Sequence, residues 1–292
     1  MTSNVLGVFW ALIAMISWGF GDYFIQKVSR IDGIWKTLFF ISVIGSIGLL
    51  PFVASDIPKL ANLHGDLFIG LAAMAMTISS VFYFEALEEG KLTVMEPVLS
   101  LELPLAAILA VVLWGESLGW VGWLLVLGIF IGNTLAVTEH HKNLHYHKRL
   151  FEKGVIYALA AALCMAFVDF LMGASSQQNP PLLTVWVVWV FSGIVSFLYL
   201  AHQGKIMELK NDFRNHRSAI LALGIFDTMG WVGFCLAASR IPIAITTAIG
   251  ESYIVITLFL GLFVNHERLR SHQRWGVGFA VLSVIVLAAL TG

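Results

Sequence analysis

Ten long apolar runs fill most of this 292-residue chain. Each run is close to the ~20 residues that a helix needs to cross about 30 Å of hydrocarbon. The runs are continuous instead of alternating between apolar and polar residues, which favours membrane-spanning helices over the strands of a membrane barrel. The sequence therefore predicts an all-α membrane protein with ten transmembrane helices. The expected spans are residues 5–27, 34–54, 67–88, 92–114, 118–138, 154–175, 181–201, 218–239, 242–264 and 274–291.

The composition leaves little room for a soluble domain. Hydrophobic residues make up 59% of the chain and charged residues only 12%, against roughly 25% charged residues in soluble globular domains. The two longest hydrophilic stretches are residues 139–153 and 202–217. The formal net charge is −1 and there is no long basic stripe, which argues against nucleic acid as a partner.

The motifs of an intramembrane enzyme are absent from the sequence. It contains no HExxH metal site, no GxSxG nucleophile elbow and no phosphate-binding P-loop. The two cysteines, Cys164 and Cys235, lie inside expected helices without the spacing of a disulfide framework or a zinc site. We therefore expect no enzymatic activity, no cofactor and no resident metal.

The sequence of the second five spans is similar to that of the first five. When residues 7–23 are placed on residues 154–170, seven positions are identical, and Asp22 falls on Asp169. Matches between apolar residues arise easily by chance, but a shared aspartate inside a membrane span does not. Because each half holds an odd number of spans, the second half must enter the membrane from the opposite side. The sequence therefore predicts two inverted five-helix repeats.

The repeats extend to the later spans of each half. Glu116 aligns with Glu267, and Glu251 aligns with Ser100. We expect the first repeat at residues 1–142, a cytoplasmic linker at 143–153 and the second repeat at 154–292.

Basic residues gather in the loops that follow the odd-numbered spans. These loops hold all of the 17 Lys and Arg residues except Lys59 and Arg240. Cytoplasmic loops of membrane proteins carry an excess of Lys and Arg. We therefore expect the odd-numbered loops in the cytoplasm and both termini outside, in a prokaryotic cytoplasmic membrane.

Short motifs in the first, fourth and tenth spans match a known family. They are Trp18-Gly19, Pro104 twelve residues before Glu116, and Glu267-x-Leu-x3-Gln273-x2-Gly276. Through these motifs and its repeat plan, the chain resembles EamA-type members of the drug/metabolite transporter superfamily. The resemblance implies a central cavity lined largely by spans 1, 3, 4, 6, 8 and 9, with alternating access. It also implies export of amino acids, other metabolites or toxic amines, driven by protons or by exchange.

Acidic residues inside the expected spans are the first candidates for function. No basic residue lies deep in any span, whereas a carboxylate facing lipid at a helix centre costs about 2.5–3.5 kcal/mol on insertion scales. We therefore expect these carboxyl groups to face a cavity or to stay protonated. Burial disfavours the charged form of a carboxyl group, so proton exchange near neutral pH becomes chemically feasible. The acidic residues are Asp22, Glu85, Glu102, Asp169, Asp227 and Glu251, with Glu96 near the start of the fourth span.

Several of these acids share a helix face with an aromatic or polar side chain one turn away. The pairs are Trp18 with Asp22, Asp22 with Gln26, Asp227 with Trp231, and Thr247 with Glu251. Tyr83 adds an aromatic surface for an apolar or cationic substrate. The candidate substrate- and proton-binding residues are therefore Asp22, Trp18, Gln26, Asp169, Asp227, Trp231, Thr247, Glu251, Tyr83 and Glu102.

Other residues suggest structural roles. Glu116 and Glu267 lie at helix junctions, where each can accept hydrogen bonds from backbone N–H groups of the next helix start. The small-residue patterns Gly128-x3-Gly132 and Gly276-x3-Ala280 allow close helix approach, either within the chain or in a homodimer.

The sequence leaves several functions open. The leading hypothesis is a secondary transporter that exports a small organic metabolite, such as an amino acid or amine, in exchange for protons. Because buried acids outnumber buried bases, transport of a cationic species or metal ion is the alternative. A non-transporting receptor could have the same fold.

Overall fold

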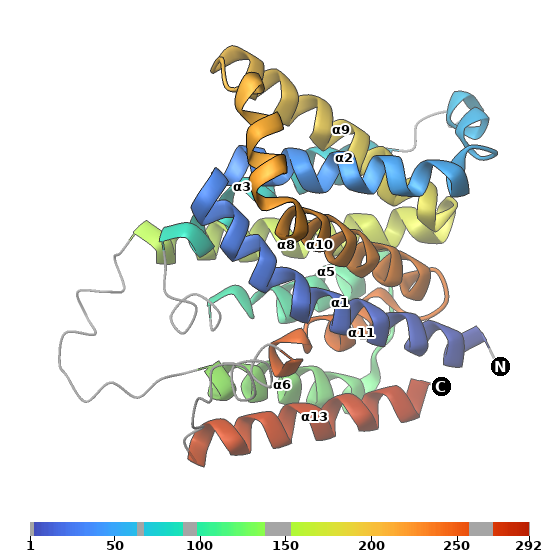
Figure 1. Ribbon diagram of the computed structural model, residues 1–292. Coiled ribbons are helices and arrows are strands. Elements are labelled where there is room, and N and C mark those ends of the chain that lie inside the picture. The colour runs from blue at the N-terminus through green and yellow to red at the C-terminus, as the bar shows by residue number, and fades with distance from the viewer. Residues whose placement is uncertain (1–2, 63–66, 90–97, 138–152, 257–270, 292) are drawn as a thin grey trace.

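The computed structural model describes residues 3–62, 67–89, 98–137, 153–256 and 271–291 and contains helices joined by turns and short loops, with no strand, in these ranges (Figure 1). The elements are α1 (Ser3–Asp32), α2 (Ile34–Val53), the 3-10 helix η1 (Ile57–Asn62), α3 (Leu67–Glu89), α5 (Glu102–Trp114), α6 (Gly119–Val137), α8 (Lys153–Gln178), α9 (Pro181–His202), α10 (Ile206–Ala238), α11 (Ile243–Gly250) and α13 (Ser271–Thr291). This confirms the predicted all-α class.

Eight helices in the described ranges are long and apolar enough to cross a membrane. Each of the eight corresponds to one predicted span. The fourth and ninth spans are represented by the shorter apolar helices α5 and α11, and parts of these spans fall outside the described residues. The expected linker, residues 143–153, also lies outside them except for Lys153, where α8 begins.

Helix pairing follows the internal duplication. By sequence order, α8, α9, α10, α11 and α13 are the counterparts of α1, α2, α3, α5 and α6. α1 packs along α10 and α3 packs along α8, so exchanging the two repeats converts one pair into the other. α2 packs on α9, α5 on α11 and α6 on α13, and each of these pairs joins two counterparts. Both termini lie at the same end of the bundle (Figure 1). The arrangement is the one that two inverted repeats produce around a pseudo-two-fold axis.

The fourth and ninth spans are interrupted at equivalent positions. A turn at Ser100 and Leu101 precedes α5, and a turn at Glu251 and Ser252 follows α11. The sequence alignment already paired Ser100 with Glu251, but it predicted continuous helices there. Pro104 explains the first break, because proline has no N–H to donate to the carbonyl four residues earlier.

The second break has no proline. There the Asn133 side chain of α6 donates a hydrogen bond to the backbone oxygen of Glu251, at 3.1 Å. A side chain from a neighbouring helix therefore satisfies a carbonyl group at the interruption, which is how irregular backbone is tolerated inside a membrane.

The small-residue patterns of α6 and α13 face each other. A Cβ atom added to Gly276 would lie 2.6 Å from the backbone nitrogen of Ala136, and one added to Gly132 would lie 2.7 Å from that of Ala280. The two helices thus approach so closely that their backbones touch. These residues serve packing within the chain, and a homodimer interface is not needed to explain them.

Replacing Gly276 with Ala is expected to destabilise the protein by about 1–3 kcal/mol, since the added methyl group has no space between two backbones. Gly278 on the same helix is the matched control, because a Cβ added there meets nothing within 4 Å. Thermal unfolding in detergent, followed by tryptophan fluorescence, should show a lower midpoint for Gly276→Ala than for Gly278→Ala. Equal midpoints would contradict the close packing of α6 on α13.

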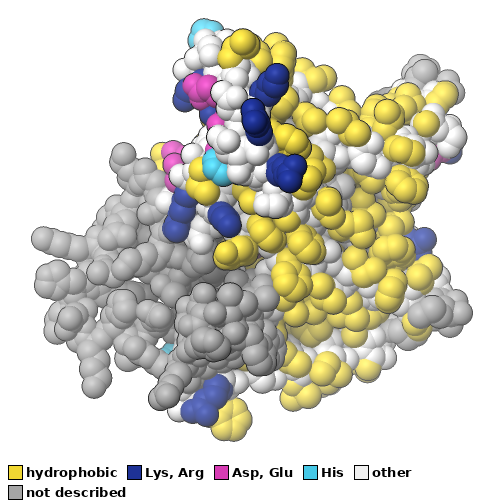
Figure 2. Space-filling view, in the orientation of Figure 1, with side chains coloured by type: hydrophobic (Ala, Val, Ile, Leu, Met, Phe, Trp, Pro, Cys, Tyr) yellow, Lys and Arg dark blue, Asp and Glu magenta, His cyan; other side chains and the backbone are white. Residues whose placement is uncertain are grey.

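One end of the bundle carries most of the charged side chains seen in Figure 2, over the first turns of α10, while the remaining described surface in that view is largely hydrophobic. α10 begins twelve residues before the predicted eighth span, and its backbone departs from helical geometry at His216. Lys36 of α2 forms ion pairs with Glu208 and Asp212 of this extension, both at 2.6 Å. The first repeat is thus tied to the second at this end.

The opposite end is tied by a helix cap. Glu116 follows α5 and accepts hydrogen bonds from the N–H groups of Ile243 (2.6 Å) and Ala244 (3.0 Å), the first residues of α11. Burial raises the pKa of the Glu116 carboxyl above its usual value, although these two N–H groups act in the opposite direction. The prediction of a capping role is confirmed, but the partner helix was wrong: α11 of the other repeat, packed on α5, takes the place of the following α6. Glu267 lies outside the described residues.

Candidate functional site

A cavity of about 50 Å³ lies at the centre of the bundle, and 17 residues line it. They come from α1, α2, α3, α5, α8, α9, α10 and the segment at and after the end of α11. Five are acidic and none of the 17 is Lys, Arg or His, so no basic side chain from the described part of the chain balances the acids. The acidic residues are Asp22, Glu102, Asp169, Asp227 and Glu251. All five are buried.

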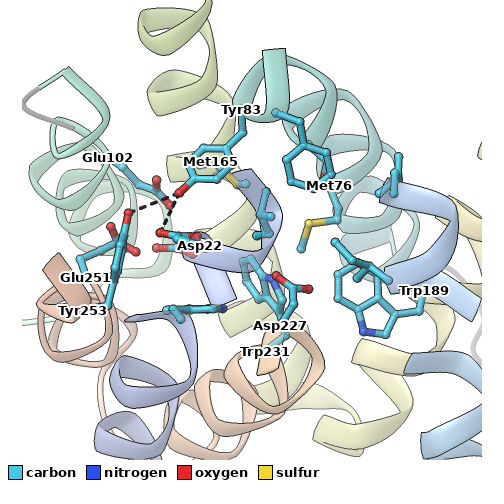
Figure 3. Close-up of a pocket in the computed structure, with 17 residues that line it drawn as sticks. Asp22, Met76, Tyr83, Glu102, Met165, Trp189, Asp227, Trp231, Glu251 and Tyr253 are labelled. Carbon is cyan, nitrogen blue, oxygen red and sulfur yellow. Dashed lines mark hydrogen bonds between the residues drawn. The ribbon is translucent and has the colours of Figure 1, made fainter. Parts of the chain in front are cut away.

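Asp22 is held by a phenol group. The Tyr83 hydroxyl of α3 donates a hydrogen bond to Oδ2 of Asp22 at 3.1 Å, and it also lies 3.4 Å from the Tyr253 hydroxyl (Figure 3). The chain of two hydroxyl groups and one carboxyl group is a path along which a proton can pass. It links α1 and α3 of the first repeat with the segment after α11 in the second.

Three other carboxyl groups form a cluster, which we term the carboxylate trio. One oxygen of each of Glu102, Asp169 and Glu251 lies within 4.8 Å of the other two. The three side chains come from the first turn of α5, from α8 and from the turn at the end of α11. The helix interruptions therefore place two of the three acids.

Asp169 is the most deeply buried of the acids, with 1% of its surface exposed. Neither of its carboxylate oxygens has a hydrogen-bond partner among the described residues. Thr247 lies beside it, but the Thr247 hydroxyl also makes no hydrogen bond of good geometry within the described ranges. Buried polar groups are normally paired, so the Asp169 carboxyl group stands out among the acids of the cavity.

The other side of the cavity is aromatic. Trp18 and Trp231 meet edge to face, with ring centroids 5.1 Å apart, and Trp189 completes the wall. Asp227 lies beside Trp231 and Trp189 (Figure 3), and no described residue pairs with its Oδ2 atom. We call Trp18, Trp189, Trp231 and Asp227 the aromatic lobe. In Figure 3, Asp22 lies between Glu102 and Glu251 on one side and Asp227, Trp231 and Trp189 of this lobe on the other.

Glycines make room for the aromatic lobe. A side chain at Gly230 would collide with the indole ring of Trp18, and a Cβ atom at Gly250 would lie 2.9 Å from the same ring. A Cβ atom at Gly45 would lie 2.5 Å from Trp189. The three positions therefore require glycine so that the indole rings can reach the centre of the bundle.

Most of the residues proposed from sequence lie around this cavity. They are Trp18, Asp22, Tyr83, Glu102, Asp169, Asp227, Trp231 and Glu251. Gln26 is half-buried and does not line the cavity. Thr247 does not line the cavity either, but it lies beside Asp169, which does. Glu85 is half-buried and lies outside the lining.

Sequence reasoning missed the contributions of α2 and α9. Leu38 and Ile41 of α2 and Trp189 of α9 line the cavity, although the resemblance implied lining largely by other spans. The two residues of α2 that line the cavity are both apolar. Trp189 is one of 10 tryptophans, and no sequence signal separates a cavity tryptophan from one that anchors a helix at the membrane surface.

Comparison with known proteins identifies the family. No curated protein matches the chain at a significant level. A crystal structure whose title names no function matches with a TM-score of 0.69 and 14% sequence identity, over 100% of this chain and 99% of the other. At that identity the likeness shows the fold alone. The profile of the EamA-like transporter family matches twice, at residues 5–138 and 152–289. The chain therefore belongs to the EamA-like transporter family, as a multi-pass membrane protein built from two repeats of the family fold.

Proposed function

We propose that this transporter exports a small amine-bearing metabolite in exchange for protons, by alternating access to the central cavity. The observation that carries the proposal is the presence of five buried carboxyl groups in a cavity whose described lining includes no basic side chain. Carboxyl groups so close together cannot all be ionised unless a cation is bound among them. Without a cation, some of them must hold protons. The carboxylate of an amino acid would find no cationic partner there, so an amine fits better than an amino acid.

The aromatic lobe suits the cationic end of such a substrate. An ammonium group over an indole ring gains about 2 kcal/mol when it is desolvated. Asp227 places a carboxyl group beside Trp231, and its free Oδ2 atom can accept a hydrogen bond from the ammonium group. Asp22, joined to Tyr83 and Tyr253, is the group we assign to proton exchange.

Alternating access requires that the two ends open in turn. The ion pairs of Lys36 join the two repeats at one end, and the Glu116 cap joins them at the other. A cavity of about 50 Å³ holds only a few water molecules, since one water needs about 10–15 Å³. The described state is therefore too tight for substrate, and entry requires one set of end contacts to separate. On the charge bias of the loops we assign the Lys36 end to the cytoplasm.

Transport by the purified protein in proteoliposomes tests the proposal. Tetramethylammonium is a suitable probe because its permanent charge prevents passive entry as a neutral base. An acidic lumen should drive its accumulation, with proton release that a trapped pH dye reports. A gradient of one pH unit is worth about 1.4 kcal/mol per proton and can sustain up to about tenfold accumulation when one proton is exchanged for each probe cation.

Protein-free liposomes provide the control for leakage. Saturable flux of amino acids without any flux of amines would overturn the substrate class. Absence of flux for both classes, by protein that is folded and correctly inserted, would favour a non-transporting receptor.

A further inference from the structure

We propose that the carboxylate trio of Glu102, Asp169 and Glu251 binds a hard divalent cation, of the class of Mg²⁺, Ca²⁺ or Mn²⁺. The site lies in the same cavity as the proposed amine site. Two of its residues, Glu102 and Glu251, lie on the other side of Asp22 from Asp227 and Trp231 (Figure 3). The proposed site goes beyond amine transport, because cation binding by these three residues does not depend on the identity of the organic substrate.

The spacing of the trio fits a single ion. Three oxygens that lie within 4.8 Å of one another can all be reached from one point at no more than about 2.8 Å, close to the roughly 2.3–2.6 Å of calcium–oxygen bonds. Small side-chain rotations are enough to close the remaining difference. The ligands come from both repeats, with Glu102 in the first and Asp169 and Glu251 in the second.

The state of Asp169 is an independent indication of a ligand. Its carboxyl group is 1% exposed, and neither oxygen has a partner among the described residues. Removing an ionised carboxylate from water without pairing it costs several kcal/mol. The Thr247 hydroxyl is fully buried and lies beside the Asp169 carboxyl group, so it is a further oxygen next to this member of the trio. A cation at the trio gives the Asp169 carboxyl group a partner.

The backbone around Glu251 supports the same placement. Glu251 lies at the helix interruption, and its carbonyl oxygen is fixed by the Asn133 side chain. Interrupted helices in membrane transporters commonly form ion sites, because their ends expose polar backbone groups near the middle of the membrane. Here the interruptions next to Glu102 and at Glu251 bring two carboxyl groups from packed helices to one point.

The donor set determines the type of ion. All three ligands are carboxylates and none is a His or Cys, which suits Mg²⁺, Ca²⁺ and Mn²⁺ better than Zn²⁺ or Cu²⁺. Up to three negative charges favour a divalent ion over Na⁺ or K⁺ on electrostatic grounds. The alternative is that the trio shares protons and binds no metal.

Binding of Mn²⁺ to the full-length protein in nanodiscs tests the proposal. Electron paramagnetic resonance reports free Mn²⁺ directly, and competition with Mg²⁺ and Ca²⁺ shows whether the site accepts the whole class. We expect one saturable site in the wild-type protein. The substitutions Asp169→Asn and Glu251→Gln should each weaken it by at least about tenfold.

Glu85→Gln is the matched control, because Glu85 is a half-buried acid of α3 that does not line the cavity. It should bind Mn²⁺ like the wild type. Asp169→Asn removes a buried charge without a partner, so we expect it to fold, and thermal unfolding verifies this. Glu251→Gln provides the second test.

The outcomes separate this proposal from the proposed function. No saturable Mn²⁺ binding by folded wild-type protein would overturn the cation site, even if amine transport is measured. Equal binding by the wild type and by both trio variants would also overturn it. Cation binding that depends on the trio, in a protein without amine flux, would support the site and overturn the proposed function. Proton uptake by the trio that no divalent ion affects would favour the shared-proton alternative.

Discussion

Replacing Asp227 with Asn should weaken the binding of tetramethylammonium by about 100- to 4,000-fold. Breaking one partner of a buried charge pair costs about 3–5 kcal/mol, and each 1.4 kcal/mol is a factor of about ten in affinity. Asp227 is 6% exposed and its Oδ2 atom has no partner among the described residues, so its charge is available to a bound cation. The asparagine side chain keeps nearly the same shape, which confines the change to charge.

Isothermal titration calorimetry on the purified protein measures this loss. Glu85→Gln neutralises an acid outside the cavity lining and should bind the probe with unchanged affinity. Asp227→Asn protein that is as stable as the wild type and binds tetramethylammonium equally well would remove Asp227 from the site. Loss of affinity in both variants would indicate a general effect of charge and no specific contact.

Replacing Asp22 with Asn should abolish accumulation driven by a pH gradient while leaving substrate exchange across the membrane. We expect this separation because exchange needs only substrate binding, whereas accumulation needs a carboxyl group that releases and takes up a proton in each cycle. In proteoliposomes with an acidic lumen, the variant should accumulate no more probe than protein-free liposomes do. Exchange of labelled for unlabelled probe without a gradient should continue.

The phenol groups around Asp22 provide a graded test of the same idea. Tyr83→Phe removes the hydrogen bond to Asp22 and should change the pH dependence of transport without abolishing it. Tyr23→Phe is the control, since Tyr23 is 56% exposed and does not line the cavity. Accumulation by Asp22→Asn at the wild-type level would show that another group carries the proton.

The sequence predicted most of the acidic site because a carboxyl group inside a membrane span is rarely exposed to lipid. Asp22, Asp169 and Asp227 could not face lipid without a large cost, so a cavity lined by several spans was the simplest arrangement. The same reasoning also selected Glu85, which lies near the end of α3 and does not line the cavity. Gln26, chosen only for its helical spacing, does not line the cavity.

Sequence patterns did not predict the contacts between the repeats. Helical periodicity places Glu116 at a helix junction, but only the packing of α11 on α5 determines that Ile243 and Ala244 are its partners. Hydropathy likewise predicts a continuous ninth span, because it depends only on the residues of that span. It contains no information on the hydrogen bond that the Asn133 side chain of α6 donates to the backbone oxygen of Glu251.

The sequence by itself determined the class of this protein, its duplication and the residues that must avoid lipid, because apolar length and the cost of buried charge act on each helix separately. The tertiary structure alone decided which carboxyl groups meet. Glu102, Asp169 and Glu251 are far apart in the chain, and they converge because two interrupted helices and α8 pack together. Such a contact depends on the relative placement of several helices, which no property of a single span encodes.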